Sequence, residues 1–459
     1  MLIKGGRVVS AAGEHVADVL VRDGKIADIR VGIPAAGQEV IDATGKLVLP
    51  GVVDPHTHFA LDTGTARTAD DFASGSASAA AGGVTTYLDF ALQRPGQTFQ
   101  QALQARLAEI DEKSVVDYGI HLNITHLPDG WEDHLADLVK EGVTSAKVYT
   151  TYKDQPFYVN DWTWYRLMER SGKAGFLVQV HAENDDILEG KKQELVQAGK
   201  TSLAYHGVAR PPVAEAEAVA RGLTFSRATG SPVYFVHLSN PLSVDLVKEA
   251  RERGTLGMVE TCPHFLVLDD SVYQGPDPQR YLMTPPLREA AMQAALWGRV
   301  TEGHVHSMGS DHCGFSLAQR SGVTDFTKVS PGIPGVETSL PLLYSFGVRR
   351  KRITILDMVR LLSTNPAKIF GLWPRKGDLA RGFDADIVVF DPAPERVLSA
   401  AELHSQAGYS PYEGLSVVGK VTATICRGEV VYQDGTVLGK PGFGEFQRCK
   451  PFDRTIALR

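Results

Sequence analysis

The chain has 459 residues, of which 43% are hydrophobic and 22% are charged. This length and composition indicate a globular protein with one large core and a smaller second domain, and they exclude a disulfide-stapled miniprotein or a disordered tail. The 47 basic and 54 acidic residues give a formal net charge of −7, spread without blocks, so we expect neither a nucleic-acid partner nor an anionic membrane partner.

The cysteines and the N-terminal segment predict a cytoplasmic protein. The four cysteines are far apart and form no CxxC pair, so they indicate reduced thiols rather than a disulfide framework. Residues 1–16 lack the apolar core of a signal peptide, and no segment approaches the roughly 18 apolar residues of a membrane span.

Both chain ends have the pattern of short antiparallel strands. Residues 1–50 alternate apolar and polar positions, with Gly and Asp at the breaks, and the same texture returns after about residue 375. We therefore predict one small β-sandwich domain built from residues 1–50 and 375–459, the latter including a C-terminal arm.

The intervening residues 51–374 predict a (β/α)₈ TIM-like barrel, which places the chain in the α/β class. Eight apolar runs alternate with helical stretches rich in Ala, Leu, Glu and Arg. An open doubly wound sheet is the alternative, but it requires a GxGxxG turn after the first strand, and none is present. The runs are residues 47–54, 83–90, 118–124, 145–150, 175–181, 232–237, 257–262 and 306–311.

Four histidines and one aspartate follow the apolar runs at the positions where such a barrel carries its site. His56 and His58 come just after the first run, whereas His181 ends the fifth, His237 the sixth and Asp311 the eighth. Alternate residues of a strand share a side, so His56 and His58 can bind the same cation. Imidazoles and a carboxylate suit Zn²⁺, and they also suit Mn²⁺ or Co²⁺.

A second HxH pattern serves as a control, because chance alone supplies about 0.4 such patterns in a chain of this composition. His304 and His306 lie before Asp311, and an extended strand would place His306 roughly 16 Å from it. We therefore predict a structural role for this pair, near the opposite end of the eighth strand.

Several motifs in chain order resemble the cyclic amidohydrolases, with the hydantoinase and dihydropyrimidinase branch the nearest. The resemblance extends over essentially the whole chain. It rests on DPHTH (54–58), Lys147 in SAKVYTTYK, VHAEN (180–184), FVHLSN (235–240), TCPH (261–264), TPPLR (284–288), GSDH (309–312) and NPAK (365–368).

The resemblance implies two divalent ions per subunit. His56 and His58 would hold one ion together with Asp311, and His181 and His237 would hold the other. Lys147, carboxylated on its amine by CO₂ to give N6-carboxylysine, would bridge both ions. A carbamate suits that position because it is anionic, whereas two cations would repel an ammonium group.

The same resemblance implies hydrolysis of a cyclic amide by a hydroxide that bridges the two ions. Asp311 would move the proton to the departing nitrogen, and Tyr152 would hydrogen-bond the oxyanion. Thr284 would contact the ring, and either Gly332 supplies a second contact or the substrate is held differently. Pro331 occupies the position where the family has an asparagine, and proline has no N–H to donate.

Three alternatives remain open. Allantoinase stays open because VNDW (159–162) and ETCPHFLVLD (260–269) resemble its segments, and a cyclic-imide hydrolase is a second alternative. Dihydroorotate is disfavoured because Ala60 replaces the arginine that would bind its carboxylate. A dihydropyrimidinase-like scaffold without activity would lack metal ligands, and here every ligand position is filled. The resemblance also implies a homotetramer or homodimer, with the tail at 440–459 as a candidate interface arm.

Overall fold

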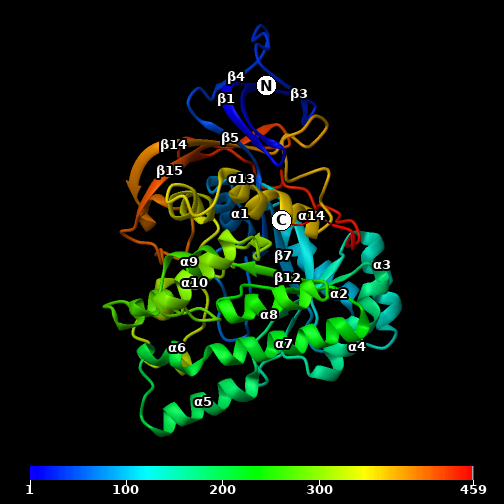
Figure 1. Ribbon diagram of the computed structural model, residues 1–459, viewed down its shortest axis with the longest axis vertical. Coiled ribbons are helices and arrows are strands. Elements are labelled where there is room, and N and C mark those ends of the chain that lie inside the picture. Colours follow the sequence, from blue (N-terminus) through cyan, green and yellow to red (C-terminus); the bar gives the residue numbers. More distant parts are fainter. Residues whose placement is uncertain (457, 459) are drawn as a thin grey trace.

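The computed structural model describes residues 1–456 and 458, which fold into a parallel barrel and a mixed sheet. Figure 1 shows the N-terminal strands of the mixed sheet at one end of the long axis, its C-terminal strands next to them, and the barrel with its surrounding helices beyond. This confirms the predicted α/β class, the barrel, and a second sheet shared by the two chain ends. Within the described residues, no helix combines the length and hydropathy needed to cross a membrane.

Eight parallel strands form the barrel, and neighbours in the chain are neighbours in the sheet. The circle closes where the His58 N–H donates to the His312 carbonyl over 2.8 Å, just beyond the last strand. The strands are β6 (Val52–Thr57), β7 (Val84–Leu92), β8 (Asp117–Asn123), β9 (Ser145–Tyr149), β10 (Leu177–His181), β11 (Val233–Phe235), β12 (Gly257–Thr261) and β13 (Ser307–Met308).

Helices connect the strands and cover the outside of the barrel (Figure 1). Side-chain caps set several helix starts; Thr98, for example, forms a capping box with Gln101 before α2. The helices are α1 (Phe72–Ala81), α2 (Phe99–Ile110), α3 (Trp131–Glu141), α4 (Asp161–Ala174), α5 (Asp185–Gln197), α6 (His206–Ala209), α7 (Pro212–Thr229), α8 (Pro241–Glu252), α9 (Pro263–Val267), α10 (Ala290–Thr301), α11 (Leu317–Arg320), α12 (Ser339–Leu343), α13 (Ile355–Val359) and α14 (Asn365–Ile369).

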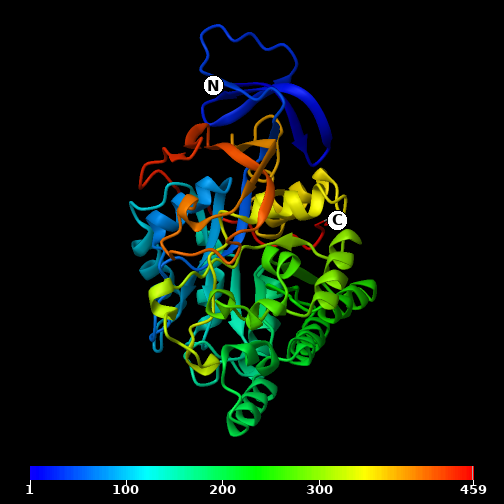
Figure 2. The same ribbon diagram turned by 90° about the vertical axis from the view of Figure 1, so that its left-hand side faces the viewer.

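The mixed sheet joins strands from the two chain ends, with β5 next to β14. Its apolar face is a separate core that includes Ile3, Val19 and Ile387. Figure 2 shows the N-terminal strands at the far end of the molecule. The strands are β1 (Leu2–Ser10), β2 (Gly13–Arg22), β3 (Lys25–Arg30), β4 (Val40–Asp42), β5 (Leu47–Pro50), β14 (Ile387–Val397), β15 (Ser416–Cys426), β16 (Glu429–Gln433) and β17 (Thr436–Val437).

The C-terminal tail covers the amino ends of three barrel strands. The Gln447 N–H donates to a carbonyl near the start of β8 at 2.7 Å. The N–H groups of Cys449 and Phe452 donate to carbonyls just before β9 and β10, at 2.9 and 2.8 Å. Cys449 and Phe452 also join a buried cluster with residues of the barrel strands. The tail therefore packs on its own barrel and closes one end, so access to the interior is from the carboxyl ends of the strands.

Candidate metal centre and active site

The five predicted imidazole and carboxylate ligands all lie at carboxyl ends of barrel strands. His56 lies within β6 and His58 directly follows it, whereas His181 is the last residue of β10. His237 and Asp311 follow β11 and β13 by two and three residues. The strand ends thus bring together side chains that are up to 255 residues apart in the chain.

One group of three residues has the spacing of a metal site. Asp311 Oδ1 lies 3.2 Å from His56 Nε2 and 3.4 Å from His58 Nε2. One ligand atom from each residue lies within 4.8 Å of the others. Burial holds the pKa of His56 well below its usual value, so the ring stays neutral and can offer a lone pair to a cation.

His181 and His237 form the other half of the arrangement. Their ring centroids are 4.6 Å apart, and the His237 ring stacks 5.3 Å from that of His56. Nδ1 of His237 is buried and has no hydrogen-bond partner among the described residues. An unpaired imidazole nitrogen beside other histidines suits a ligand to a cation.

Lys147 lies at the middle of this arrangement. Its Nζ is 2.7 Å from His56 Nε2 and about 4.7 and 4.8 Å from the ring centroids of Phe90 and Tyr149. The side chain is 1% exposed, and burial lowers its pKa to about 8. An amine that loses its proton near neutral pH is a nucleophile that can react with CO₂, so the position fits a carbamate.

Three residues of the site have a strained backbone. Tyr152, His237 and Asp311 have φ angles of 71°, 40° and 48°, in the left-handed region that side chains with a Cβ seldom adopt. The Tyr152 N–H donates to Asp185 Oδ1 at 2.7 Å, which holds the strained residue in place. The three side chains therefore project from fixed turns rather than from regular strands.

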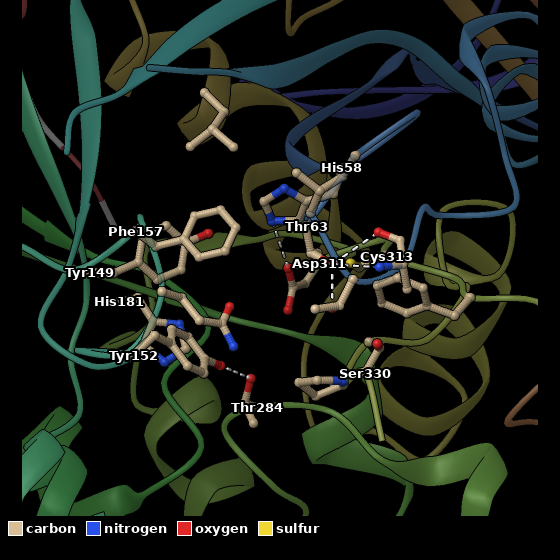
Figure 3. Close-up of a pocket in the computed structure, with 18 of the residues that line it drawn as sticks. His58, Thr63, Tyr149, Tyr152, Phe157, His181, Thr284, Asp311, Cys313 and Ser330 are labelled. Carbon is tan, nitrogen blue, oxygen red and sulfur yellow. Dashed lines mark hydrogen bonds and ion pairs between the residues drawn. The ribbon is translucent and has the colours of Figure 1, made fainter. Parts of the chain in front are cut away.

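A cavity of about 550 Å³ opens above the ligands. Figure 3 shows His58 and Asp311 on one side of it and Tyr149, Tyr152 and His181 on the other. Leu61, Phe90 and Phe157 add an apolar wall, and Thr63, Gln155 and Ser330 add polar groups. This volume is suitable for a small ring with a substituent.

Tyr152, Thr284 and Gly332 all line the cavity. The Tyr152 hydroxyl is hydrogen-bonded to Thr284 Oγ1 (Figure 3). Burial raises the pKa of Tyr152 to about 12, so the hydroxyl stays protonated and can donate. The Gly332 N–H is already used, because it donates to the Leu282 carbonyl at 2.8 Å.

Sequence reasoning missed two carboxylates behind the histidines. Glu260 Oε1 accepts from His56 Nδ1 at 2.7 Å and from the His237 N–H at 3.0 Å. Glu183 Oε2 lies 2.7 Å from His181 Nε2. The signal available in the sequence was an acidic residue inside the apolar run GMVETC and another two positions after His181.

Asn123 is a further cavity residue that the sequence did not single out. It ends β8, pairs in register with Lys147, and is only 3% exposed. Its Oδ1 has no hydrogen-bond partner in the described part of the chain. A buried, unpaired amide oxygen at a cavity wall is a candidate for contact with a ligand.

The control pair lies apart from these groups. His306 Nδ1 accepts a hydrogen bond from the Val259 backbone N–H at 3.0 Å, and His304 is near Glu302 at the surface. Neither residue lines the cavity. The HxH at 304–306 is thus integrated into the packing of the last strand, as its distance from Asp311 indicates.

Comparison with known proteins agrees with this geometry. Residues 47–431 match the Amidohydrolase family. Together with the barrel and the His56, His58 and Asp311 cluster, this match defines the chain as a metal-dependent amidohydrolase.

The chain belongs to the hydantoinase and dihydropyrimidinase family within that class. It is 42% identical over 461 residues to the D-hydantoinase of Geobacillus stearothermophilus, covering 99% of this chain and 98% of that protein. It is 40% identical over 457 residues to the D-phenylhydantoinase of Escherichia coli strain K12, covering 98% of each.

Solved structures give the same assignment. Dihydropyrimidinase from Brevibacillus agri superposes with a TM-score of 0.96 at 38% identity, covering 99% of both chains. L-Hydantoinase from Arthrobacter aurescens superposes with a TM-score of 0.89 at 31% identity, covering 97% of this chain and 98% of that one.

Proposed function

We propose that the protein opens the ring of a hydantoin or a dihydropyrimidine to give an N-carbamoyl amino acid. Water adds its oxygen to the ring carbonyl carbon, the carbonyl–nitrogen bond breaks, and the departing nitrogen takes up a proton. The observation that carries this proposal is the clustering of His56, His58, Lys147 and Asp311 beneath the cavity that Tyr152 lines. The full-length similarity to D-hydantoinase supports the substrate class.

The residues present fit two divalent cations, with Zn²⁺ as the expected ion and Mn²⁺ or Co²⁺ as alternatives. We assign His56, His58 and Asp311 to one ion, His181 and His237 to the other, and carboxylated Lys147 to both. When bound, the cations would activate water and polarise the ring carbonyl. The unpaired His237 Nδ1 and the low pKa of Lys147 support this assignment.

The chain's own side chains then have distinct tasks. A carboxylate oxygen of Asp311 takes the proton from the attacking water and then delivers this proton to the departing ring nitrogen. Tyr152 donates its hydroxyl proton in a hydrogen bond to the oxygen that becomes negative.

Thr284 and Gly332 are the proposed ring contacts. Thr284 lies within hydrogen-bond distance of Tyr152, and this contact supports a role for Thr284 next to the reacting carbonyl. A contact from the Gly332 N–H requires that group to leave the Leu282 carbonyl first. Pro331 cannot replace it as a donor.

A substrate panel distinguishes the candidate activities. Purified protein would be incubated separately with hydantoin, dihydrouracil, allantoin and succinimide. Ring opening would be monitored through the loss of ultraviolet absorbance. We expect kcat/KM for hydantoin or dihydrouracil to exceed the values for the other two rings. Preference for allantoin or succinimide would contradict the proposal and favour the allantoinase or imidase alternative. The proposed homotetramer or homodimer would be tested by light scattering on the same sample.

Substitution of Lys147 tests the bridge. For Lys147→Ala we expect loss of bound metal and a fall in kcat of about a thousandfold or more, because the site loses its central anion. Added acetate or propionate should restore part of both, since a small carboxylate can occupy the vacated space. Two metal ions per chain with full activity in the unsupplemented variant would reject the bridging role.

Metal content also distinguishes an enzyme from a scaffold. Elemental analysis of wild-type protein grown in metal-replete medium should give about two divalent ions per chain. A value near zero would favour the inactive scaffold.

A further inference from the structure

A buried ion pair lies between one proposed metal ligand and the proposed oxyanion donor. The Glu183 carboxylate is fully buried and accepts from both Nε and Nη2 of Arg210, the former at 3.1 Å. The same carboxylate lies 2.7 Å from His181 Nε2. Because the fork of Arg210 engages both oxygens, the orientation of the carboxylate is fixed.

Glu183 determines which nitrogen of His181 is available to a cation. An ionised carboxylate can only accept, so the proton of the neutral imidazole lies on Nε2. Nδ1 then carries the free lone pair, and a ligand histidine needs that lone pair. The ring position is also restricted by His237, whose centroid is 4.6 Å away.

Arg210 also contacts Tyr152. Its guanidinium carbon lies 5.5 Å from the centre of the Tyr152 ring, within the range of a cation–π contact. The Arg210 carbonyl accepts from Arg288 Nη1 at 2.5 Å, so the segment that carries it is itself held. One guanidinium therefore packs on the ring of Tyr152 and fixes the carboxylate behind His181.

We propose that Glu183 and Arg210 act together as positioning residues that align His181 for a metal ion and Tyr152 for the oxyanion. The inference rests on the proposed function, since it assigns these two residues to the same site. Neither residue touches the reacting atoms. Lysine could not replace Arg210, because an ammonium group offers neither the bidentate fork nor the flat face.

The first experiment measures metal binding. Apo protein would be titrated with Co²⁺ and followed by its visible absorption, for wild type, Glu183→Gln and Arg210→Lys. We expect one of the two binding steps, the one that involves His181, to lose about 10- to 100-fold in affinity in Glu183→Gln, with the other step little changed. The matched control is Arg299→Lys, which alters an Arg–carboxylate pair with Asp245 away from the cavity.

The second experiment measures turnover. Arg210→Lys, with both metal sites saturated, should lower kcat at least tenfold with KM within about threefold, because Tyr152 acts on the transition state. In a Tyr152→Phe background the same substitution should change kcat less than about threefold, since the donor it positions is already absent. Unfolding midpoints would be recorded for every variant.

The two experiments together test whether Glu183 and Arg210 position His181 and Tyr152. Unchanged Co²⁺ affinity together with independent effects of Arg210→Lys and Tyr152→Phe on kcat would overturn the proposal and leave a structural ion pair. If Glu183→Gln does not fold, Arg210→Lys and its double variant still provide the test. If the wild type opens no ring, the proposed function fails, whereas the Co²⁺ titration still judges the alignment of His181.

Discussion

Glu260 illustrates how a residue outside the cavity sets the chemistry inside it. Its Oε1 accepts from His56 Nδ1 and its Oε2 from the Tyr234 hydroxyl, both at 2.7 Å. With the His56 proton held on Nδ1, Nε2 faces Lys147 and Asp311 as a lone-pair donor. Glu260 and Glu183 thus each fix which ring nitrogen of a histidine carries the proton, and each does so from the side away from the cavity.

The Tyr152 hydroxyl is testable by removing one atom. For Tyr152→Phe we expect kcat to fall by about 10²- to 10³-fold, the usual cost of losing one oxyanion donor. KM should change little, because the hydrogen bond strengthens only as charge develops. Steady-state kinetics on hydantoin or dihydrouracil would measure both constants.

Tyr158→Phe is the control for that substitution, since Tyr158 does not line the cavity. It should retain wild-type kinetics and metal content. Equal losses in the two variants would show that the Tyr152 effect is not specific to the oxyanion.

Some site residues could be predicted from the sequence and others could not. Five could be predicted because a ligand-type side chain coincides with the end of an apolar run: His56, His58, His181, His237 and Asp311. Arg210 could not be predicted, because it contacts Glu183 from a connecting segment 27 residues further along the chain. The engagement of the Gly332 N–H by Leu282 was equally hidden, since only the folded loops bring those backbones together.

At the scale of elements, the apolar runs located all eight barrel strands but not their divisions. The run at 47–54 is two strands, since β5 pairs with β1 and β14 in the mixed sheet and β6 begins the barrel. Gly51 lies between the two strands. A glycine is needed there because the Thr85 side chain occupies the space that a Cβ would take. Hydrophobic runs mark burial, and the sheet that a buried strand joins depends on contacts distant in sequence.

His404 gives the packing of elements a pH dependence. Its Nδ1 lies 3.0 Å from Glu337 Oε1, just before α12, and Glu337 also accepts from Ser78 on α1. The hydrogen bond and charge of Glu337 raise the pKa of His404 above its usual 6.5. The ion pair therefore stabilises the fold fully below about pH 6.5 and less as the pH rises through the higher folded-state value.

His404→Gln should remove this dependence. At pH 6 we expect the variant to be less stable than wild type by a few tenths to about 1 kcal/mol, because the pair is partly exposed. The difference should shrink as the pH rises through the raised folded-state pKa of His404, where the wild-type side chain loses its charge. Urea unfolding at several pH values would measure it, and a difference that grows with pH would contradict the assignment.

At the scale of the whole molecule, a buried charge cluster joins the barrel to the mixed sheet. Lys376 Nζ lies 2.7 Å from Asp117 in β8, 3.3 Å from Asp384 and 2.6 Å from Asp386, which directly precedes β14. Lys25 and Arg427 add further contacts to Asp384 and Asp117. Under the proposed division at residues 51–374 and 375–459, Lys376 lies at the junction of the two parts.

Removing Lys376 should destabilise the entire fold rather than one part of it. Its side chain is 0% exposed, and the three carboxylates raise its pKa, so the folded state depends on the positive charge. In Lys376→Met, Asp386 would remain buried without its cation, which typically costs about 3–5 kcal/mol. We expect one cooperative urea transition at a lower midpoint, because both parts lose the same contact.

Lys25→Met is the control for that substitution. Lys25 belongs to the same cluster but is 47% exposed, and its loss should cost less than about 1 kcal/mol. Equal shifts in the two variants, or two separate transitions in Lys376→Met, would refute the view that this one buried cation joins the barrel and the sheet into a single cooperative unit.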